Sequence, residues 1–345
     1  MRRRTLLSAS LGLGALAGLA GIAGVGSLPD FSQPNTGDAG DIGLTLHTGS
    51  DLAFGTTVTI KVLHGDAVSA QAAIQAALRE VKKIDGLMSV HQERSQVFVL
   101  NRHGFVDAPD DHLLYVLAFA QQLSRLTAGA FDITVQPLWR AFSEARSRGA
   151  LPAPDQIAAA KALVDWGQVD TRRQQVRLRT AGMAITLNGL AQGYAVDLAL
   201  AALQTRGIRH ALLDTGEFGA IGSKSAGQAW ALGIGSPRQA DAIVARVRMD
   251  GRKVATSGDY ATVFSSDFVH HHIFDPASGD SSPALASVTV VAPTGILADG
   301  LSTAFMVMGA ERAFALAAQL PDVDLMLITK NGSIRKTAGF PELQV

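Results

Sequence analysis

The second half of this chain places its strand-like segments in succession, and this pattern most restricts its fold. The expected strands there are residues 210–214, 230–234, 243–247, 261–264, 269–274 and 287–291. Earlier in the chain, alternation over 57–62 predicts a half-buried strand, and apolar residues at steps of three and four over 67–88 predict an amphipathic helix. Strands in runs, without steady alternation of strand and helix, predict an α+β domain with a mixed sheet.

Composition excludes several classes of function. The chain has no cysteine, so disulfides, cysteine-bound zinc, iron–sulfur clusters and a thiol nucleophile are all excluded. Its 30 basic residues balance 30 acidic ones, without a basic run after position 4, so nucleic acid is not an expected partner. Neither a G-x-G-x-x-G after a strand nor a G-x-x-x-x-G-K-[ST] occurs, so neither a Rossmann site nor a P-loop is expected.

The N-terminus has the pattern of a targeting segment. Arg2, Arg3 and Arg4 precede two leucines and a weakly hydrophobic stretch rich in Gly and Ala. This pattern is typical of a twin-arginine export signal, which we place at residues 1–28, and it predicts a periplasmic protein. The alternative is an uncleaved N-terminal membrane anchor. Residues 29–50, rich in Gly, Ser, Thr and Asp, are expected to be a linker before a domain over 51–345.

Asp299 and Thr303 stand four residues apart in a helix expected over 299–308. That spacing places a carboxylate and a hydroxyl on one helix face, where both are oxygen ligands suited to Mg²⁺. Because Mg²⁺ takes few protein carboxylates when it also holds a substrate phosphate, the pair indicates phosphate chemistry. The alternative is structural: Asp299 caps the helix and Thr303 bonds back to a carbonyl one turn earlier.

Three glycine-containing segments could lie near a ligand. In 129–138, small residues precede Asp132, whose carboxylate could accept hydrogen bonds from a base or a sugar. In 186–197, two glycines stand at an expected helix start, where free N–H groups attract phosphate. In 213–219, two acids occupy a glycine-rich turn after a strand. Each segment by itself is equally compatible with an ordinary turn.

Three consecutive histidines precede an Asp-Pro turn. On the strand expected over 269–274, His270 and His272 would face one side and His271 the other. One of them could then act as acid, base or ligand while another packs. Neighbours on one strand cannot all converge on one ion, so a three-histidine zinc or copper site is excluded.

Taken in order, these segments resemble the ApbE family of flavin transferases. The likeness runs from Phe54-Gly55-Thr56 through 84–89, 96–101, 129–138, 189–197, Ser257-Gly258-Asp259-Tyr260 and 272–276 to 298–303. It implies a T-fold-like α+β domain with helices packed on the sheets. It also implies Mg²⁺-dependent transfer of FMN from FAD to a threonine or serine of a periplasmic target protein, with release of AMP.

The resemblance also implies roles for individual residues. Asp299 and Thr303 would bind Mg²⁺ together with the backbone carbonyl near Gly189, and His272 and Asp299 would be catalytic. The FAD site would be lined by Ala130, Phe131, Asp132, Thr186, Gln192 and Phe274. Phe54 and His91 stand where the family usually has a methionine and a tyrosine that enclose the flavin ring.

This chain departs from the family pattern at a few positions. Besides Phe54 and His91, Gln192 replaces a charged Lys or Glu, and Glu217 replaces a common glycine. Glu217 and the export signal are similar to the NosX branch, which would make the partner an acceptor flavoprotein, periplasmic or membrane-attached, of nitrous oxide reduction. Two alternatives stay open: a flavin-binding maturation factor with little turnover, and an FAD hydrolase in which water replaces the acceptor hydroxyl.

Overall fold

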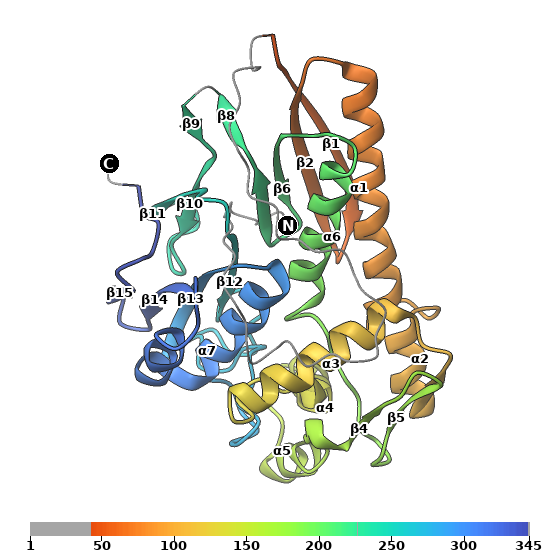
Figure 1. Ribbon diagram of the computed structural model, residues 1–345. Coiled ribbons are helices and arrows are strands. Elements are labelled where there is room, and N and C mark those ends of the chain that lie inside the picture. The colour runs from red at the N-terminus through yellow and green to blue at the C-terminus, as the bar shows by residue number, and fades with distance from the viewer. Residues whose placement is uncertain (1–42, 226, 344–345) are drawn as a thin grey trace.

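Eight strands form one antiparallel sheet in a computed structural model that describes residues 43–225 and 227–343 (Figure 1). In spatial order they are β1 (Thr45–Ala53), β2 (Thr56–His64), β6 (His210–Asp214), β7 (Phe218–Ile221), β12 (Lys253–Gly258), β13 (Leu285–Ala292), β14 (Asp324–Thr329) and β15 (Ile334–Lys336). Helices α1 (Ala67–Met88), α6 (Ala191–Gln204) and α7 (Gly295–Ala317) pack against one face. The predicted α+β class is confirmed.

Alternation along the central strands builds a separate core on each face of this sheet. Ala255, Val290 and Leu325 lie in the core under α1, α6 and α7. Their neighbours Val254, Val291 and Met326 lie in a second core, which Trp230 and Val247 close from the other side. That second face is covered by the ribbon of β10 (Ala231–Gly235) and β11 (Ile243–Arg248). All of β13 is therefore buried, as expected for a strand covered on both faces.

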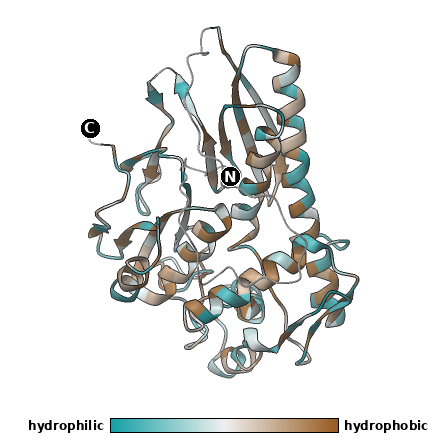
Figure 2. Cartoon of the chain, in the orientation of Figure 1, coloured by the Kyte–Doolittle hydropathy of each residue, from teal (hydrophilic) through white to brown (hydrophobic). Residues whose placement is uncertain are grey.

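The remaining elements form the lower part of the molecule in Figure 1. They are α2 (Gln96–His103), α3 (Asp111–Leu126), the short helix η1 (Ile133–Val135), α4 (Gln136–Ser147), α5 (Pro154–Lys161), the short helix η2 (Trp166–Gln168) and the sheet of β3 (Phe105–Asp107), β5 (Gln175–Leu178) and β4 (Val169–Thr171). A small hairpin of β8 (Ser223–Ser225) and β9 (Gln228–Ala229) completes the fold. Figure 2 shows hydrophobic residues on the main sheet and hydrophilic ones along α1.

The predicted helix over 67–88 is confirmed, and capping explains where it begins. Asp66 accepts hydrogen bonds from the backbone N–H groups of Val68 and Ser69, which satisfies donors that have no partner inside the helix. Asn331-Gly332, a dipeptide typical of tight hairpin turns, joins β14 to β15, with Gly332 at φ 89°. In α7, Gly309 has a non-helical φ of 73° and separates two helical stretches, and it directly follows the helix expected over 299–308.

The expected linker ends earlier than position 50. Its residues 29–42 and the export signal, or the alternative anchor, over 1–28 lie outside the described residues, but β1 already begins at Thr45. Every residue of β1 is paired with β2, and Gly49 faces Ile74 of α1 so closely that a side chain there would collide with it. The small polar residues that suggest a linker thus belong to an edge strand that a helix covers.

Two further expected strands, 261–264 and 269–274, are absent from the described structure. The segment between β12 and β13 instead forms turns and bends held by isolated bridges between Val263 and His271 and between Phe274 and Ser281. Backbone N–H groups there donate to the side chains of Ser265, Asp267 and Ser281, which compete with the hydrogen bonds of a regular ladder. Among the described residues, no helix has the length and hydrophobicity that a membrane crossing requires.

Candidate active site

Helices α6 and α7 start side by side, and two glycines make that possible. A side chain on Gly193 would collide with the carbonyl oxygen of Gly295, and one on Gly295 would collide with the carbonyl of Gly193. Only glycine lets two backbones approach so closely. The two helix starts, with their unpaired N–H groups, therefore lie together under the sheet.

The carboxylate of Asp299 lies at this junction. Its side chain is 4% exposed, and its Oδ2 accepts a hydrogen bond of 3.0 Å from the backbone N–H of Gly193. Among the described residues, no hydrogen-bond donor is recorded for its Oδ1. Burial raises the pKa of Asp299 to about 7, and the Gly193 hydrogen bond acts in the opposite direction. A cation beside Oδ1 would restore the charged form.

The structure brings Thr303 and Gly189 to the same place. A Cβ atom built on Gly189 would lie 2.9 Å from the Thr303 Oγ1, so the missing side chain leaves the hydroxyl accessible from that side. The Gly189 carbonyl oxygen also faces α7, 3.8 Å from where a Cβ of Gly300 would lie. The three residues expected to bind Mg²⁺ are thus neighbours, although they are 114 positions apart at most.

These donors fit a hard cation. A carboxylate oxygen, a hydroxyl and a carbonyl oxygen lie near this junction, and oxygen ligands of this kind are those that Mg²⁺ takes. Within residues 43–225 and 227–343, no cluster of three or more His, Asp or Glu residues is placed to hold a metal. A cation here would therefore complete its shell with water or substrate oxygens, as Mg²⁺ commonly does at phosphate sites.

Ser257, at the end of β12, connects the sheet to these ligands. Its Oγ lies 2.8 Å from the Ser302 Oγ and 3.1 Å from the Thr303 Oγ1. The Ser302 hydroxyl in turn donates to the carbonyl of Asp299. This network restricts the orientation of the Thr303 hydroxyl. Sequence reasoning did not assign Ser257 a role, although the segment 257–260 carried part of the resemblance.

The residues expected to line the FAD site fall partly around these ligands. Phe131 lies 3.5 Å from where a Gly189 side chain would begin, and the Thr186 N–H donates to the carbonyl of Ile133 at 2.8 Å. Ala130 is buried in the same turn. The loop 129–134 therefore adjoins the loop 186–189 that leads into α6.

Asp132 uses its carboxylate to hold that loop. Its Oδ1 accepts from the N–H and the hydroxyl of Thr134, at 2.7 and 2.6 Å, and its Oδ2 accepts from the N–H of Trp166 at 3.1 Å. Burial raises its pKa, while these hydrogen bonds act in the opposite direction. Asp132 thus shapes the loop beside Phe131, a role that its turn-forming sequence also predicts.

Gln192 spans from α6 to the glycine-rich turn after β6. Its Nε2 donates to the carbonyl of Thr215, and a side chain on Gly216 would collide with it. The Thr215 hydroxyl returns a hydrogen bond to the carbonyl of Gln192 at 3.3 Å. In the same turn, Glu217 accepts a hydrogen bond from the N–H of Thr256 at 3.2 Å. Both departures from the family pattern therefore lie between α6 and β12.

The other expected flavin residues lie in different surroundings. Phe54 occupies the β1–β2 turn at φ 52° and packs half-buried against the main core. His91 is exposed and meets Trp139 edge to face, with ring centroids 6.4 Å apart. Phe274 is 4% exposed, and its ring lies 5.1 Å from that of Phe142 in a small core of the lower part. The rings of these three residues pack against different partners.

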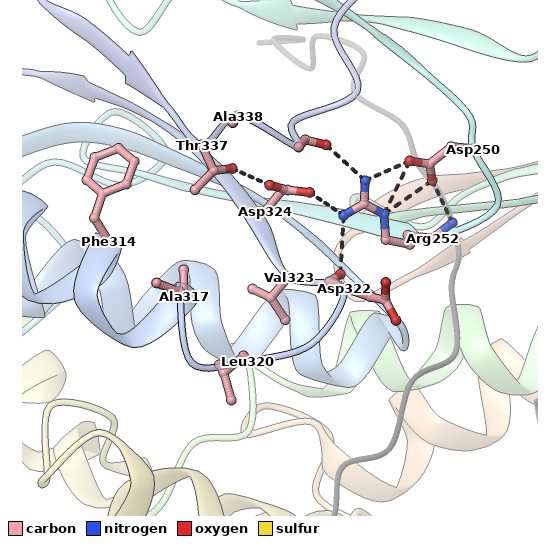
Figure 3. Close-up of a pocket in the computed structure, with 12 residues that line it drawn as sticks. Asp250, Arg252, Phe314, Ala317, Leu320, Asp322, Val323, Asp324, Thr337 and Ala338 are labelled. Carbon is pink, nitrogen blue, oxygen red and sulfur yellow. Dashed lines mark hydrogen bonds and ion pairs between the residues drawn. The ribbon is translucent and has the colours of Figure 1, made fainter.

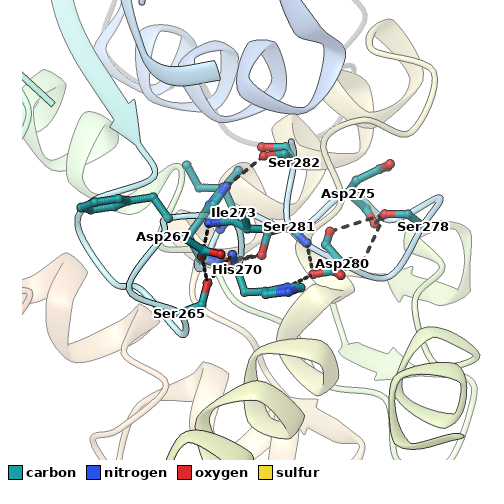
Figure 4. A network of polar contacts seen from close by, with 12 residues as sticks. Ser265, Asp267, His270, Ile273, Asp275, Ser278, Asp280, Ser281 and Ser282 are labelled. Carbon is teal, nitrogen blue, oxygen red and sulfur yellow. Dashed lines mark hydrogen bonds and ion pairs between the residues drawn. The ribbon is translucent and has the colours of Figure 1, made fainter. Parts of the chain in front are cut away.

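The three histidines differ in their environment. His270 contacts Asp280, with 2.8 Å between Nδ1 and Oδ1 (Figure 4). His271 is fully buried, with Nε2 2.9 Å from the carbonyl of Ser282 and Nδ1 accepting from the Ile273 N–H. Burial lowers the pKa of His271 to about 4. Both ring nitrogens of His271 are thus engaged in holding the loop.

His272, like His270, has a ring nitrogen for which no partner is recorded among the described residues. Its Nδ1 lies 3.3 Å from the carbonyl of Thr262, and no partner is recorded among the described residues for its Nε2. Burial lowers its pKa, whereas the Thr262 contact and the Asp259 charge act in the opposite direction. With the proton on Nδ1 facing that carbonyl, Nε2 is the basic atom. His271 is thus the histidine that packs, and His272 is the candidate for proton transfer that the resemblance implies.

A cavity of about 790 Å³ lies away from these residues, beside the last turns of α7 (Figure 3). Arg252 lies at its wall and donates to the carboxylates of Asp250 and Asp324 and to the carbonyls of Asp322 and Gly339. Both terminal nitrogens and the Nε of Arg252 already have partners, so Arg252 is engaged in holding the surrounding segments together. Arg252 and its hydrogen-bond partners therefore form a structural ion-pair cluster at the wall of the cavity.

The chain matches the model of the ApbE family over residues 54–327. It is 30% identical to an FAD:protein FMN transferase of Haemophilus influenzae over 312 residues, which cover 84% of this chain and 88% of the relative. It is 29% identical to one of Vibrio cholerae over 287 residues, covering 80% of this chain and 85% of the relative.

Solved structures are similar as well. An ApbE protein from Thermotoga maritima superposes with a TM-score of 0.76 at 29% identity, over 85% of this chain and 97% of the other. The apo form of a flavinyl transferase from Pseudomonas stutzeri gives a TM-score of 0.75 at 28% identity, over 88% of this chain and 98% of the other.

Proposed function

Because this chain belongs to the ApbE family and is an FAD:protein FMN transferase, we propose that it uses Mg²⁺ and modifies a threonine or serine of an exported protein. The observation that supports this proposal is that Asp299, Thr303 and Gly189 are neighbours where the starts of α6 and α7 adjoin. Bound there, Mg²⁺ would offset the charge that develops on the diphosphate as its bridging bond breaks.

The residues of this chain then have distinct tasks. Asp299 and Thr303 hold the cation, and Ser257 orients the Thr303 hydroxyl through their 3.1 Å contact. The acceptor hydroxyl oxygen forms a bond to the phosphorus of the FMN half, the diphosphate bond to AMP breaks, and AMP leaves with the bridging oxygen. His272 accepts the hydroxyl proton at Nε2, directly or through water.

The target and the compartment are also proposals. Arg2 to Arg4 and the weakly hydrophobic stretch after them support export by the twin-arginine route to the periplasm. Glu217, in a Gly-Glu-Phe sequence like that of the NosX branch, supports an acceptor in nitrous oxide reduction. A fusion of residues 1–42 to a reporter that is active only after folded export would test the first point.

One observation favours a second function. The Gln192 amide is engaged with the Thr215 carbonyl, in a position where relatives carry a charged residue. A neutral, occupied side chain there could leave a protein that binds flavin but transfers little, or one that passes FMN to water. Both alternatives keep the same cation site: in the first, little FMN is transferred, and in the second, water is the acceptor.

A single assay separates these functions. The purified chain is incubated with FAD, Mg²⁺ and a candidate exported flavoprotein domain, and the acceptor is weighed by mass spectrometry. We expect a mass increase of one FMN with the wild type and none with Asp299→Ala. Retained flavin without acceptor labelling would identify a carrier, and AMP release without acceptor would identify a hydrolase. Equal labelling by Asp299→Ala would refute the metal assignment.

A further inference from the structure

Near the starts of α6 and α7, a carboxylate of each helix accepts hydrogen bonds from backbone N–H groups of the other helix. Asp299 of α7 accepts from the Gly193 N–H in the first turn of α6. In the other direction, Asp197 of α6 accepts from the N–H groups of Gly295 and Ile296, at 2.8 and 3.1 Å. Each helix thus supplies a side chain that binds free N–H groups of the other, where the positive end of a helix dipole favours a negative charge.

Asp197 is a buried acid with a buried basic partner. It is 1% exposed, and its Oδ1 lies 3.9 Å from the Nζ of Lys253, which is 5% exposed. Lys253 also donates to the carbonyl of Pro293 at 3.1 Å, two residues before α7 begins. Desolvation raises the pKa of Asp197 and lowers that of Lys253, while their mutual attraction opposes both shifts. Asp197 therefore binds the first N–H groups of α7, and Lys253 binds the carbonyl that precedes the helix.

Strand β12 contacts the segment of α7 at two places, one just before the helix and one at Thr303. Lys253 meets the chain just before α7, and Ser257, four residues later, meets Thr303. The four steps along the strand from Lys253 to Ser257 span about 13 Å, and the eight steps along the helix from Gly295 to Thr303 span about 12 Å. Because these lengths match, the position of the helix start determines which part of α7 faces Ser257 and Gly189.

We propose that Asp197 and Lys253 are positioning residues for the metal site, which set where Asp299 and Thr303 stand by fixing the start of α7. The inference rests on the proposed function, because it concerns the cation that the transferase would use. Mg²⁺ and Mn²⁺ need well-placed oxygen ligands, and Mg²⁺ demands near-octahedral geometry at 2.0–2.1 Å. A small displacement of the first turn of α7 would therefore weaken the site without removing any ligand.

The variant to use is Asp197→Asn, because it keeps the size of the side chain. Its NH₂ group faces one of the two backbone N–H donors and cannot accept a hydrogen bond from it. Asp324→Asn is the matched control, since Asp324 is also a poorly exposed acid that accepts from a basic side chain, Arg252, and lies beyond the far end of α7. If the unpaired Lys253 prevents folding of the first variant, Asp197→Asn combined with Lys253→Met removes that charge as well.

The test measures Mn²⁺ binding by electron paramagnetic resonance on the folded full chain, with a fixed concentration of FAD and no acceptor. We expect the dissociation constant of Mn²⁺ to rise at least tenfold in Asp197→Asn and to change less than twofold in Asp324→Asn. In the transfer assay, the Mg²⁺ concentration for half-maximal rate should rise while the rate at saturating Mg²⁺ largely recovers.

The outcomes are distinguishable. Wild-type affinity for Mn²⁺ in Asp197→Asn, with a fall in melting temperature like that of Asp324→Asn, would show a purely structural role and overturn the inference alone. Binding of Mn²⁺ by Asp299→Ala as tightly as by the wild type, or no binding by the wild type, would overturn the proposed metal site and the inference with it.

Discussion

The hydroxyl oxygens of Ser257 and Thr303 lie 3.1 Å apart, one at the end of a central strand and the other on the helix that carries the candidate cation site. Ser257 also lies 2.8 Å from the Ser302 hydroxyl, so it is part of a network behind the expected ligands. This relationship makes β12, as well as α7, part of the site.

Ser257→Ala should weaken the response to Mg²⁺. The loss of one hydrogen bond of about 1 kcal/mol should raise the Mg²⁺ concentration for half-maximal rate roughly fivefold. Thr256→Val is the control, because its hydroxyl contacts Thr289 at 2.9 Å rather than the candidate ligands. Equal Mg²⁺ responses in both variants would contradict a role for Ser257.

Asp299→Asn should stabilise the metal-free chain at neutral pH. Burial raises the pKa of Asp299 to about 7, so the folded chain loses stability as the pH rises from about 4, the ordinary value, through 7. Asparagine avoids that loss, which amounts to at most about 4 kcal/mol. Urea unfolding with a chelator at pH 8 and pH 4 should show a gain at pH 8 that disappears at pH 4.

His272→Gln should lower the transfer rate by a factor of roughly 10²–10⁴, the usual contribution of a general base. FAD affinity, measured by fluorescence quenching, should stay close to that of the wild type, because the proton transfer occurs after binding. A rate within a few-fold of the wild type would exclude His272 as the base.

His271 should make the fold sensitive to acid. Burial lowers its pKa to about 4, below the ordinary 6.5, so its contribution is present above pH 6.5 and is lost as the pH falls toward 4. The loss is at most about 3 kcal/mol. His271→Gln should be less stable than the wild type at pH 7, and its unfolding free energy should change less between pH 6.5 and 4.5.

Gly193→Ala should be severely destabilising. The added methyl group would collide with the backbone of Gly295 and contact Asp299, and backbone atoms cannot move aside like a side chain. We expect a loss of at least about 2 kcal/mol by urea unfolding. The control is Gly86→Ala in the last turn of α1, where nothing lies within 4 Å of an added Cβ and helix propensity predicts a gain of up to about 1 kcal/mol.

Part of the fold and of the site was predictable because the signals are local. The periodicity of 67–88, the Asn331-Gly332 turn and the spacing of Asp299 and Thr303 each involve residues a few positions apart. Backbone geometry relates such neighbours directly, so a pattern in the sequence indicates which side chains share a face. The resemblance to a family then added residues that no local pattern relates, such as Gly189.

Other features depend on partners far away in the chain. The composition of residues 45–50 suggests a linker, but pairing with β2 makes them a strand. In 261–274, backbone N–H groups donate to the side chains of Ser265, Asp267 and Ser281 instead of to a neighbouring strand. In the sequence, Asp197 stands out only weakly, as an acid on a buried helix, and nothing marks Lys253 as a positioning residue. The reason is that both bind backbone groups near position 295, far away in the chain.

The sequence by itself determined the class of fold, the helix that carries Asp299 and Thr303, and the family likeness, since these depend on periodicity, spacing and residue order. Only the tertiary structure decided that Gly189 meets Thr303, that Ser257 supports it, and that Asp197 and Lys253 hold the start of α7. The physical reason is that buried charges and unpaired backbone groups must find partners, and which partners are in reach depends on how the helices and the sheet pack.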